Sequence, residues 1–276
     1  MPTQLRPIDK RLQRAARDGA TVERIRQLLN AGADRTSRDE DGCTALYHAI
    51  DFGHTHLLYV LSTENMLRDV IYPDTVRSYL HVAVEEDRPC ALRQLLQLGC
   101  DVNVRLHGLT LLTYALLMRS YACAMALLCD GRCDVNAQAH SGALKHPLDH
   151  VLFNTHHYTS MSVLQHRDLL LTMMLQCGLN VNCQRDDWSP LNYCIPHGYN
   201  AWVKLLIDRS DVDVNATQQN GLYPVLTAAV YGNTQALELL RDANADMCLT
   251  SRVVTSTEQD SFGKKQVRLQ LTKFTL

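Results

Sequence analysis

The feature that most constrains this 276-residue chain is a short segment that recurs about every 34 residues. Thr44-Ala45-Leu46-Tyr47-His48-Ala49 is one copy, and its final alanine serves as an anchor for finding the others. The seven anchors are Ala15, Ala49, Ala83, Ala115, Val151, Cys194 and Ala228. Successive anchors lie 34, 34, 32, 36, 43 and 34 residues apart. Such a period indicates a repeat architecture in which each unit stacks on its neighbours.

A second marker runs in phase with the anchors. A leucine pair precedes a glycine by a fixed step, as from Leu29 to Gly32 and from Leu96 to Gly99. An Asp-Val-Asn turn or a related sequence follows, for example at residues 101–103. Two independent markers that keep one phase over seven periods exclude a chance pattern.

Each residue type in the period has a structural reason. A Thr or Ser before the copy suits the N-cap of a first helix, and Pro suits its first turn. Leu46 and Ala49 lie three residues apart, on one helical face, and the small anchor lets a neighbouring helix come close. The leucine pair is the buried stripe of a second helix, and Gly32 suits a left-handed helix stop. Each period therefore predicts a helix, a turn, a second helix and a projecting polar loop.

The period and its Thr-Pro-Leu-His-x-Ala pattern resemble the ankyrin repeat over about residues 7 to 250. The resemblance implies an all-α solenoid of helix-turn-helix units with projecting β-hairpin-like loops. About seven repeats would fill residues 1–250, and residues 251–276 would form a tail outside the repeat. This family binds many unrelated partners, so the resemblance specifies the fold far better than the function.

Two stretches of the array depart from the pattern. Residues 62–75 are irregular, and Pro73 argues against a continuous helix there. An insert occupies residues 152–168 of the fifth period. We expect both departures to alter the loop side, where solenoids tolerate insertion. In the tail, the alternating sequence QVRLQLTKF predicts either a short strand or the beginning of another module.

Composition and charge narrow the function classes. The net charge is −2, which gives no global attraction to nucleic acid. No apolar run approaches the roughly 20 residues of a membrane span, and the first residues lack the apolar core of a signal peptide. The 10 cysteines show no paired spacing. We therefore expect reduced thiols in the cytoplasm, with the nucleus as the alternative compartment, and a monomer that binds neither nucleic acid nor membrane.

The sequence gives little support for catalysis, and we expect no enzyme, no catalytic residue and no cofactor. It contains no phosphate-binding loop, no Gly-x-Ser-x-Gly elbow and no His-Glu-x-x-His. A metal site built from His146, His150, His156, His157 and His166 is the one chemical alternative. Against it, His146 occupies the N-cap position of its period. Cys129 and Cys133 are four residues apart and are expected to pack at a helix end.

The resemblance also places the surface that would bind a partner. Ankyrin-like proteins vary at the end of the first helix and at the loop tip. Mapped by motif, these positions are Asp51, Phe52, Glu85, Glu86, Leu117, Met118, Trp188, His197, Leu222, Val230 and Tyr231. Several are large and apolar where a solvent-facing residue is usually polar, which is typical of interaction hot spots. The alternative is that these side chains pack against loops or the tail.

Two functions fit this sequence. The first is a scaffold that binds a protein or peptide on the concave face of helices and loops. Its acidic group, Asp51, Glu85 and Glu86, favours a partner with basic residues at one end. The second is a substrate-recognition adaptor, for example of a ubiquitin ligase, which recruits another factor through the tail. The tail lacks the Leu-Cys-Arg helical box expected of such adaptors.

Overall fold

The structure, a computed structural model, describes residues 5–63, 66, 78–140, 146–153, 161–183, 189–218 and 221–248. It divides into two compact units, Met1–Gly178 and Leu179–Leu276. The described residues are mainly helical, and the helices come in consecutive pairs. The all-α class predicted from the period is therefore confirmed.

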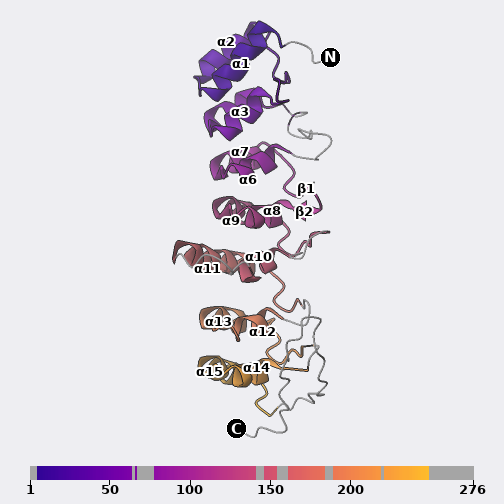
Figure 1. The fold of residues 1–276 in the computed structure, drawn as a ribbon, viewed down its shortest axis with the longest axis vertical. Coiled ribbons are helices and arrows are strands. Elements are labelled where there is room, and N and C mark those ends of the chain that lie inside the picture. The colour runs from indigo at the N-terminus through magenta and orange to yellow at the C-terminus, as the bar shows by residue number, and fades with distance from the viewer. Residues whose placement is uncertain are drawn as a thin grey trace, which may run out of the picture. The chain divides into compact units, whose positions relative to one another are not determined.

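Within the described residues, the first unit contains five helix pairs that follow one another along the chain (Figure 1). The first helices of the pairs are α1 (Pro7–Arg17), α3 (Ala45–Asp51), α6 (Tyr79–Glu85), α8 (Leu111–Leu117) and α10 (Pro147–Phe153). The second helices are α2 (Val22–Asn30), α4 (Leu58–Leu61), α7 (Pro89–Gln97), α9 (Tyr121–Asp130) and α11 (Met161–Gln176). A 3₁₀ turn, η1 (Thr55–Leu57), leads into α4.

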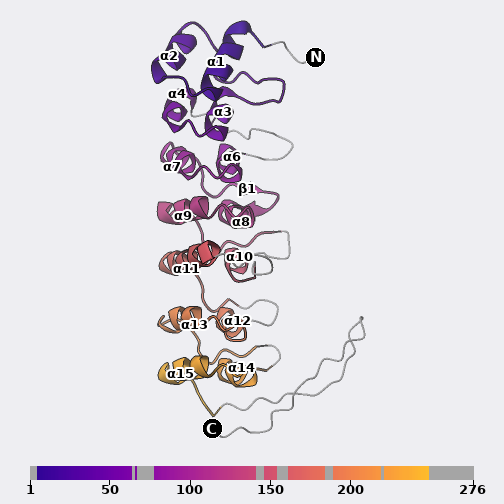
Figure 2. The same ribbon diagram turned by 60° about the vertical axis from the view of Figure 1, so that its left-hand side comes forward.

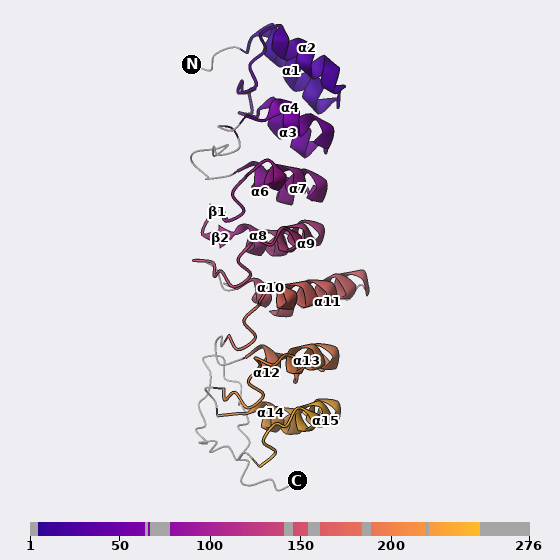
Figure 3. The same cartoon turned by 180° about the vertical axis from the view of Figure 1, so that it is seen from behind.

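The described part of the second unit contains two further pairs, α12 (Pro190–Cys194) with α13 (Asn200–Ile207), and α14 (Pro224–Val230) with α15 (Thr234–Asp242). Within this unit α12 contacts α14, and α13 contacts α15. Figure 3 shows the two pairs one after the other. Each pair thus stacks on its neighbour helix by helix, as in the first unit.

Stacking in the first unit produces two layers, which Figure 2 shows side by side. The inner layer joins α1, α3, α6, α8 and α10, and the outer layer joins α2, α4, α7, α9 and α11. The anchors Ala49, Ala83 and Ala115 are fully buried between inner helices, where a larger side chain would hold the helices apart. Burial of leucines such as Leu46 and Leu80 supplies the main favourable free energy of this stacking.

The first helices begin at the caps that the sequence predicts. The Oγ1 atoms of Thr44 and Thr110 and the Oγ of Ser189 accept hydrogen bonds from main-chain N–H groups three residues on. His146 takes the same position before α10, and its Nδ1 accepts a hydrogen bond from the N–H of Leu148. A histidine that caps a helix has one ring nitrogen committed to the backbone.

Turns of the Asp-Val-Asn type connect the pairs. In these turns the first carboxylate accepts the N–H two residues on, as Asp101 does from Asn103. The loop before α8 is an antiparallel hairpin of β1 (Arg105–Leu106) and β2 (Leu109–Thr110), with Arg105 opposite Thr110. This hairpin projects on the inner-layer side (Figure 2), as the resemblance implies.

One position in the repeat ties three of the described pairs to the pair before them. At these boundaries the residue five beyond the anchor bonds to a main-chain carbonyl at the end of the preceding inner helix. His54 bonds to the carbonyl of Arg17 over 2.9 Å, and Arg88 donates to the carbonyl of Asp51. In the second unit the Asn233 amide donates to the Ile195 carbonyl over 2.9 Å. Carbonyls at a helix C-terminus lack an intrahelical partner, and these side chains supply one.

The insert in the fifth period behaves differently from the expectation. Residues 154–160, together with most of the irregular stretch at 62–75 and the tail at 251–276, lie outside the described residues. Residues 161–168, expected on the loop side, instead form the first half of α11. The reason is local, because Met161–Gln176 is an unbroken run without Gly or Pro and is rich in leucine and methionine.

Candidate functional site

The predicted partner-binding residues of the first unit lie together at the ends of three successive inner helices. We call Asp51, Phe52, Glu85, Glu86, Leu117 and Met118 the helix-end row. Phe52, Glu86 and Met118 are the C-cap residues of α3, α6 and α8. Since α6 contacts both α3 and α8, the row crosses three neighbouring repeats.

Apolar side chains in this row are exposed to solvent. Phe52 is 48% exposed, and Leu117 and Met118 are 47% exposed each. Among the described residues the exposed large hydrophobics also include Tyr59 and Leu169, which lie on the second helices α4 and α11. Within the described residues, the helix-end row thus carries three exposed apolar side chains, which lie on two of the three repeats that the row crosses.

The acidic residues of the row are not equivalent. The Tyr114 hydroxyl donates a hydrogen bond to Glu85 Oε1, so this half-buried carboxylate already links α6 to α8. Glu86 is exposed, and Asp51 is half-buried. Across the described part of the chain, the carboxylates of Asp51 and Glu86 have no hydrogen-bond or ion-pair partner. They are the two charges of the row that a partner can neutralise.

A hollow of about 430 Å³ adjoins Phe52. Asp51, Phe52 and Tyr47 line it from α3 and its C-cap, and Asp41 lines it from the preceding loop. The one cation in its lining is Arg17, whose guanidinium lies 4.0 Å from Asp39 Oδ2 and 3.3 Å from His48 Nε2. The hollow therefore combines aromatic walls with carboxylates.

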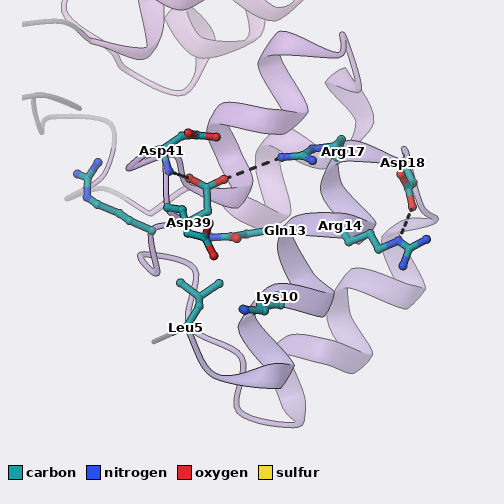
Figure 4. A pocket seen from close by; sticks show the side chains of 10 residues that line it. Leu5, Lys10, Gln13, Arg14, Arg17, Asp18, Asp39 and Asp41 are labelled. Atoms are coloured by element: carbon teal, nitrogen blue, oxygen red, sulfur yellow. Dashed lines mark hydrogen bonds and ion pairs between the residues drawn. The ribbon is translucent and has the colours of Figure 1, made fainter. Parts of the chain in front are cut away.

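A second hollow, of about 710 Å³, lies beside the first and shares Arg17 and Asp41 with it (Figure 4). Four basic and four acidic side chains line it: Lys10, Arg14, Arg17, Arg38, Asp18, Asp39, Glu40 and Asp41. Figure 4 shows Arg17 directed toward Asp39, and Arg14 toward Asp18, where the Nε–Oδ2 distance is 3.6 Å. The opposite charges of this lining balance, so this hollow has no net preference for either sign.

Sequence reasoning missed Arg17, Tyr47 and Asp39 as members of this surface. The signal for Arg17 was present, because it stands two residues beyond the anchor Ala15, as Asp51 does beyond Ala49. Asp39 had no such signal. Its Oδ1 accepts the N–H groups of Cys43 and Asp41, and its Oδ2 lies 2.7 Å from His48 Nε2. Only the folded loop brings these groups together.

The second unit carries the remaining predicted residues. Val230 and Tyr231 end α14 and are 37% and 54% exposed, while Leu222 is half-buried in the preceding loop. The exposed ring of His197 packs against Tyr193, with centroids 4.4 Å apart, and stacks on Tyr199. Trp188 lies outside the described residues.

Three of the five histidines of the alternative metal hypothesis lie within the described residues. His146 and His150 are buried, and the ring of His166 stacks on Tyr121 with centroids 5.8 Å apart. His156 and His157 fall outside the described residues. Within the described ranges, three or more His, Cys, Asp or Glu side chains nowhere converge as metal ligands would.

All ten cysteines lie within the described residues, and all are free thiols. Cys129 is exposed at the end of α9, and Cys133 is half-buried beyond it. Burial raises the pKa of Cys133 to about 12 and the pKa values of Cys100 and Cys123 to about 11. These three thiols stay protonated at neutral pH. The packing expected at the end of α9 therefore applies to Cys133, while Cys129 is exposed.

A family model described as ankyrin repeats (3 copies) matches residues 12–106 and 159–251, together more than half of the chain. The chain belongs to the ankyrin-repeat family. Ankyrin repeats in general mediate contacts between proteins, and their fold is typical of non-enzymatic interaction scaffolds.

A solved ankyrin structure shares the fold. The chain is similar to the ankyrin repeat domain of Bcl-3, described as a unique member of the IkappaB protein family, with a TM-score of 0.60 and 23% sequence identity. The alignment covers 83% of this chain and 97% of that one. At this identity the likeness shows a common fold alone. No curated protein matches the chain. Among the described residues, no helix of this ankyrin array combines the length and apolar character needed to cross a membrane.

Proposed function

We propose that the protein is an interaction scaffold that binds a protein or peptide segment through the helix-end row of its first unit. The observation that carries this proposal is the exposure of Phe52, Leu117 and Met118, at 47–48%, on the two repeats that flank α6. Stacked repeats form extended surfaces that suit such binding. The second-unit positions Val230 and Tyr231 extend the proposal to a further contact of the same kind.

The magnitude of apolar burial supports this assignment. Burying a large apolar side chain fully contributes about 1.5–3 kcal/mol. These three side chains are about half exposed, so a partner that covers them gains roughly half of that for each. The free energy gained by binding must also offset the translational and rotational freedom that the partner loses. The charged groups of the row and the hollow beside Phe52 therefore have to contribute to the binding free energy. The proposal therefore includes Asp51, Glu86 and the hollow in one surface.

The compartment and the oligomeric state are part of the same proposal. The protein would act as a monomer in the cytoplasm, or alternatively the nucleus, where reduced thiols persist. Ten free cysteines support this placement. The adaptor role would depend on the tail, which lies outside the described residues, and no structural observation favours it over the scaffold. Catalysis has no part in the proposal.

A pull-down from cell lysate, read by mass spectrometry, tests the scaffold function. The variant Phe52→Asp/Met118→Asp places two charges in the row. The matched control Tyr59→Asp/Leu169→Asp places the same charges at exposed apolar positions of the second helices, where Tyr59 is 71% exposed. We expect partners to be lost with the row variant and kept with the control. Partners lost only with the control variant would place the binding surface on the outer layer instead.

A further inference from the structure

We propose that the helix-end row recognises an extended protein segment in which two basic residues and one large apolar residue follow one another at intervals of about three. The order of the positions along the row is basic-x-x-basic-x-x-apolar, and the bound segment can run in either chain direction. This inference rests on the proposed scaffold function and specifies its partner by chemistry. Each of the three positions corresponds to one repeat of the first unit.

The interval follows from the stacking of the inner helices. Helices α3, α6 and α8 pack side by side in the inner layer. Packed helix axes lie about 8–10 Å apart. An extended chain advances about 3.3–3.6 Å per residue. A bound segment that crosses the row therefore passes from one repeat to the next in about three residues.

The first position is the hollow of about 430 Å³ beside Phe52. Its lining offers the rings of Tyr47 and Phe52 together with the carboxylates of Asp41 and Asp51. A lysine or arginine suits this combination, because its aliphatic stem lies along aromatic surface while its charge meets a carboxylate or a ring face. Arg17, the cation of the lining, is directed toward Asp39 (Figure 4).

The second position is the end of α6. Its exposed charge is the carboxylate of Glu86, which has no ion-pair or hydrogen-bond partner within the described ranges. Its neighbours Glu85 and Asp87 accept hydrogen bonds from Tyr114 and Ser120, so they add negative potential while their geometry is fixed by the next repeat. A basic residue of the partner is favoured here by charge complementarity.

The third position is the end of α8, where the chemistry changes. Leu117 and Met118 expose apolar surface side by side, and methionine adapts its shape to an incoming side chain. The next residue, Arg119, is exposed and carries a positive charge that disfavours a third basic residue. A large apolar side chain is therefore the matching group at this repeat.

Selection of random twelve-residue peptides displayed on phage, using the full chain as bait, tests this specificity. We expect enrichment of basic-x-x-basic-x-x-apolar sequences with the natural protein. Asp51→Lys/Glu86→Lys should instead enrich acidic residues at the first two positions. Met118→Ala should weaken a synthetic enriched peptide about ten-fold, measured by fluorescence anisotropy. Tyr59→Ala is the matched control, and circular dichroism verifies that each variant is folded.

The outcomes separate this inference from the scaffold function itself. Enriched peptides that lack the basic positions, yet lose binding with Phe52→Asp/Met118→Asp, would overturn the segment and leave the scaffold surface standing. Peptides that bind equally to Phe52→Asp/Met118→Asp would overturn both. A selection that enriches no peptide would also overturn the segment, while the lysate pull-down decides the scaffold function independently.

Discussion

The guanidinium of Arg88 donates two hydrogen bonds to the main-chain carbonyl of Asp51, from Nε over 3.0 Å and from Nη2 over 2.8 Å. Arg88 is the N-cap residue of α7, and Asp51 is the last residue of α3 in the preceding repeat. One side chain thus satisfies a helix-terminal carbonyl across a repeat boundary. The bond also holds in place the helix end that presents Phe52.

Removal of this link should weaken the boundary between the second and third repeats. Arg88→Ala is expected to lower the free energy of unfolding by about 1.5–3 kcal/mol, the usual contribution of a hydrogen bond to a charged group. Arg93→Ala, on an exposed position of the same helix, is the control and should change it by less than about 0.5 kcal/mol. Urea unfolding followed by circular dichroism measures both. Equal effects of the two variants would contradict the role of Arg88.

Gly19 and His54 form a second close contact between repeats. Gly19 has a φ of +67°, and a Cβ at this position would lie 2.5 Å from Cε1 of His54. Gly32, with a φ of +91°, has nothing within 4 Å of such a Cβ. Gly32→Ala should cost about 1–2 kcal/mol from backbone strain alone. Gly19→Ala should cost at least about 1 kcal/mol more, because the His54 ring must move from the Arg17 carbonyl.

Thermal and urea unfolding of the two glycine variants checks this difference. The double variant Gly19→Ala/His54→Ala separates the steric contribution, since it removes the ring that the new methyl group would meet. We expect His54→Ala to cost less stability in the Gly19→Ala background than in the natural chain. Costs that are equal in both backgrounds would show that the two residues do not interact.

The contribution of Asp9 to the free energy of unfolding should depend on pH. Its buried carboxylate accepts hydrogen bonds from Arg6 Nε over 2.6 Å and from the N–H of Asp34 over 2.8 Å. The hydrogen bonds from Arg6 lower the pKa of Asp9 more than burial raises it. Because the folded state favours the charged form, this stabilisation is complete above the ordinary value of about 3.9 and is lost as pH falls through the lower folded value.

The variant Asp9→Asn keeps the shape of the side chain and removes its charge. At pH 7 we expect it to lower the free energy of unfolding by about 1–2 kcal/mol. The difference from the natural chain should shrink as the pH falls below about 4, because the carboxyl group of Asp9 is then protonated in the unfolded chain while the folded chain still holds it charged. Urea unfolding at several pH values tests this. A difference that stays constant from pH 7 to pH 3 would be inconsistent with the ion pair to Arg6.

Cysteine reactivity should follow burial. Burial raises the pKa of Cys100 and Cys123 to about 11, so about one thiol in a thousand is ionised at pH 8. Cys90 and Cys248 are exposed. Iodoacetamide at pH 8 should modify the exposed pair at least about 100-fold faster, as followed by peptide mass spectrometry. Comparable rates in the folded chain would contradict the packing described around the first two thiols.

Most of the fold could be predicted from the sequence because the repeat encodes it locally. Thr44, Thr110 and Ser189 cap the expected helices, and anchors such as Ala83 are buried between them. Each of these features depends on residues a few positions apart. The α11 extension could not be predicted from the repeat, since no other period contains it, although its composition favours a helix.

At two positions the backbone has a positive φ although the residue is not glycine. Asp87 and Arg119 stand four residues beyond their anchors, where four other periods have glycine. Both adopt positive φ, +47° and +59°, like the glycines they replace. Stacking on both sides fixes the turn and overrides the local preference of these residues. A sequence reading that relied on glycine alone would have placed the turns of these two repeats incorrectly.

The candidate surface was predictable as a set of positions and not as a set of interactions. Motif mapping located Phe52 and Met118, which are indeed exposed. It could not show that the Tyr114 hydroxyl donates a hydrogen bond to the carboxylate of Glu85, or that Arg17 and Asp39 form an ion pair near Phe52. These contacts join residues of different repeats or of a helix and a loop, so they depend on the folded geometry.

Photo-crosslinking from single positions shows whether the helix-end row contacts a partner protein. A benzophenone amino acid would replace Phe52 or Met118 in one pair of variants, and Tyr59 or Leu169 in the control pair. After irradiation in lysate, crosslinked proteins would be identified by mass spectrometry. We expect one shared partner to be crosslinked from Phe52 and Met118, and the same partner not to be crosslinked from Tyr59 or Leu169. A partner crosslinked from Tyr59 or Leu169 and absent from both row positions would contradict this expectation.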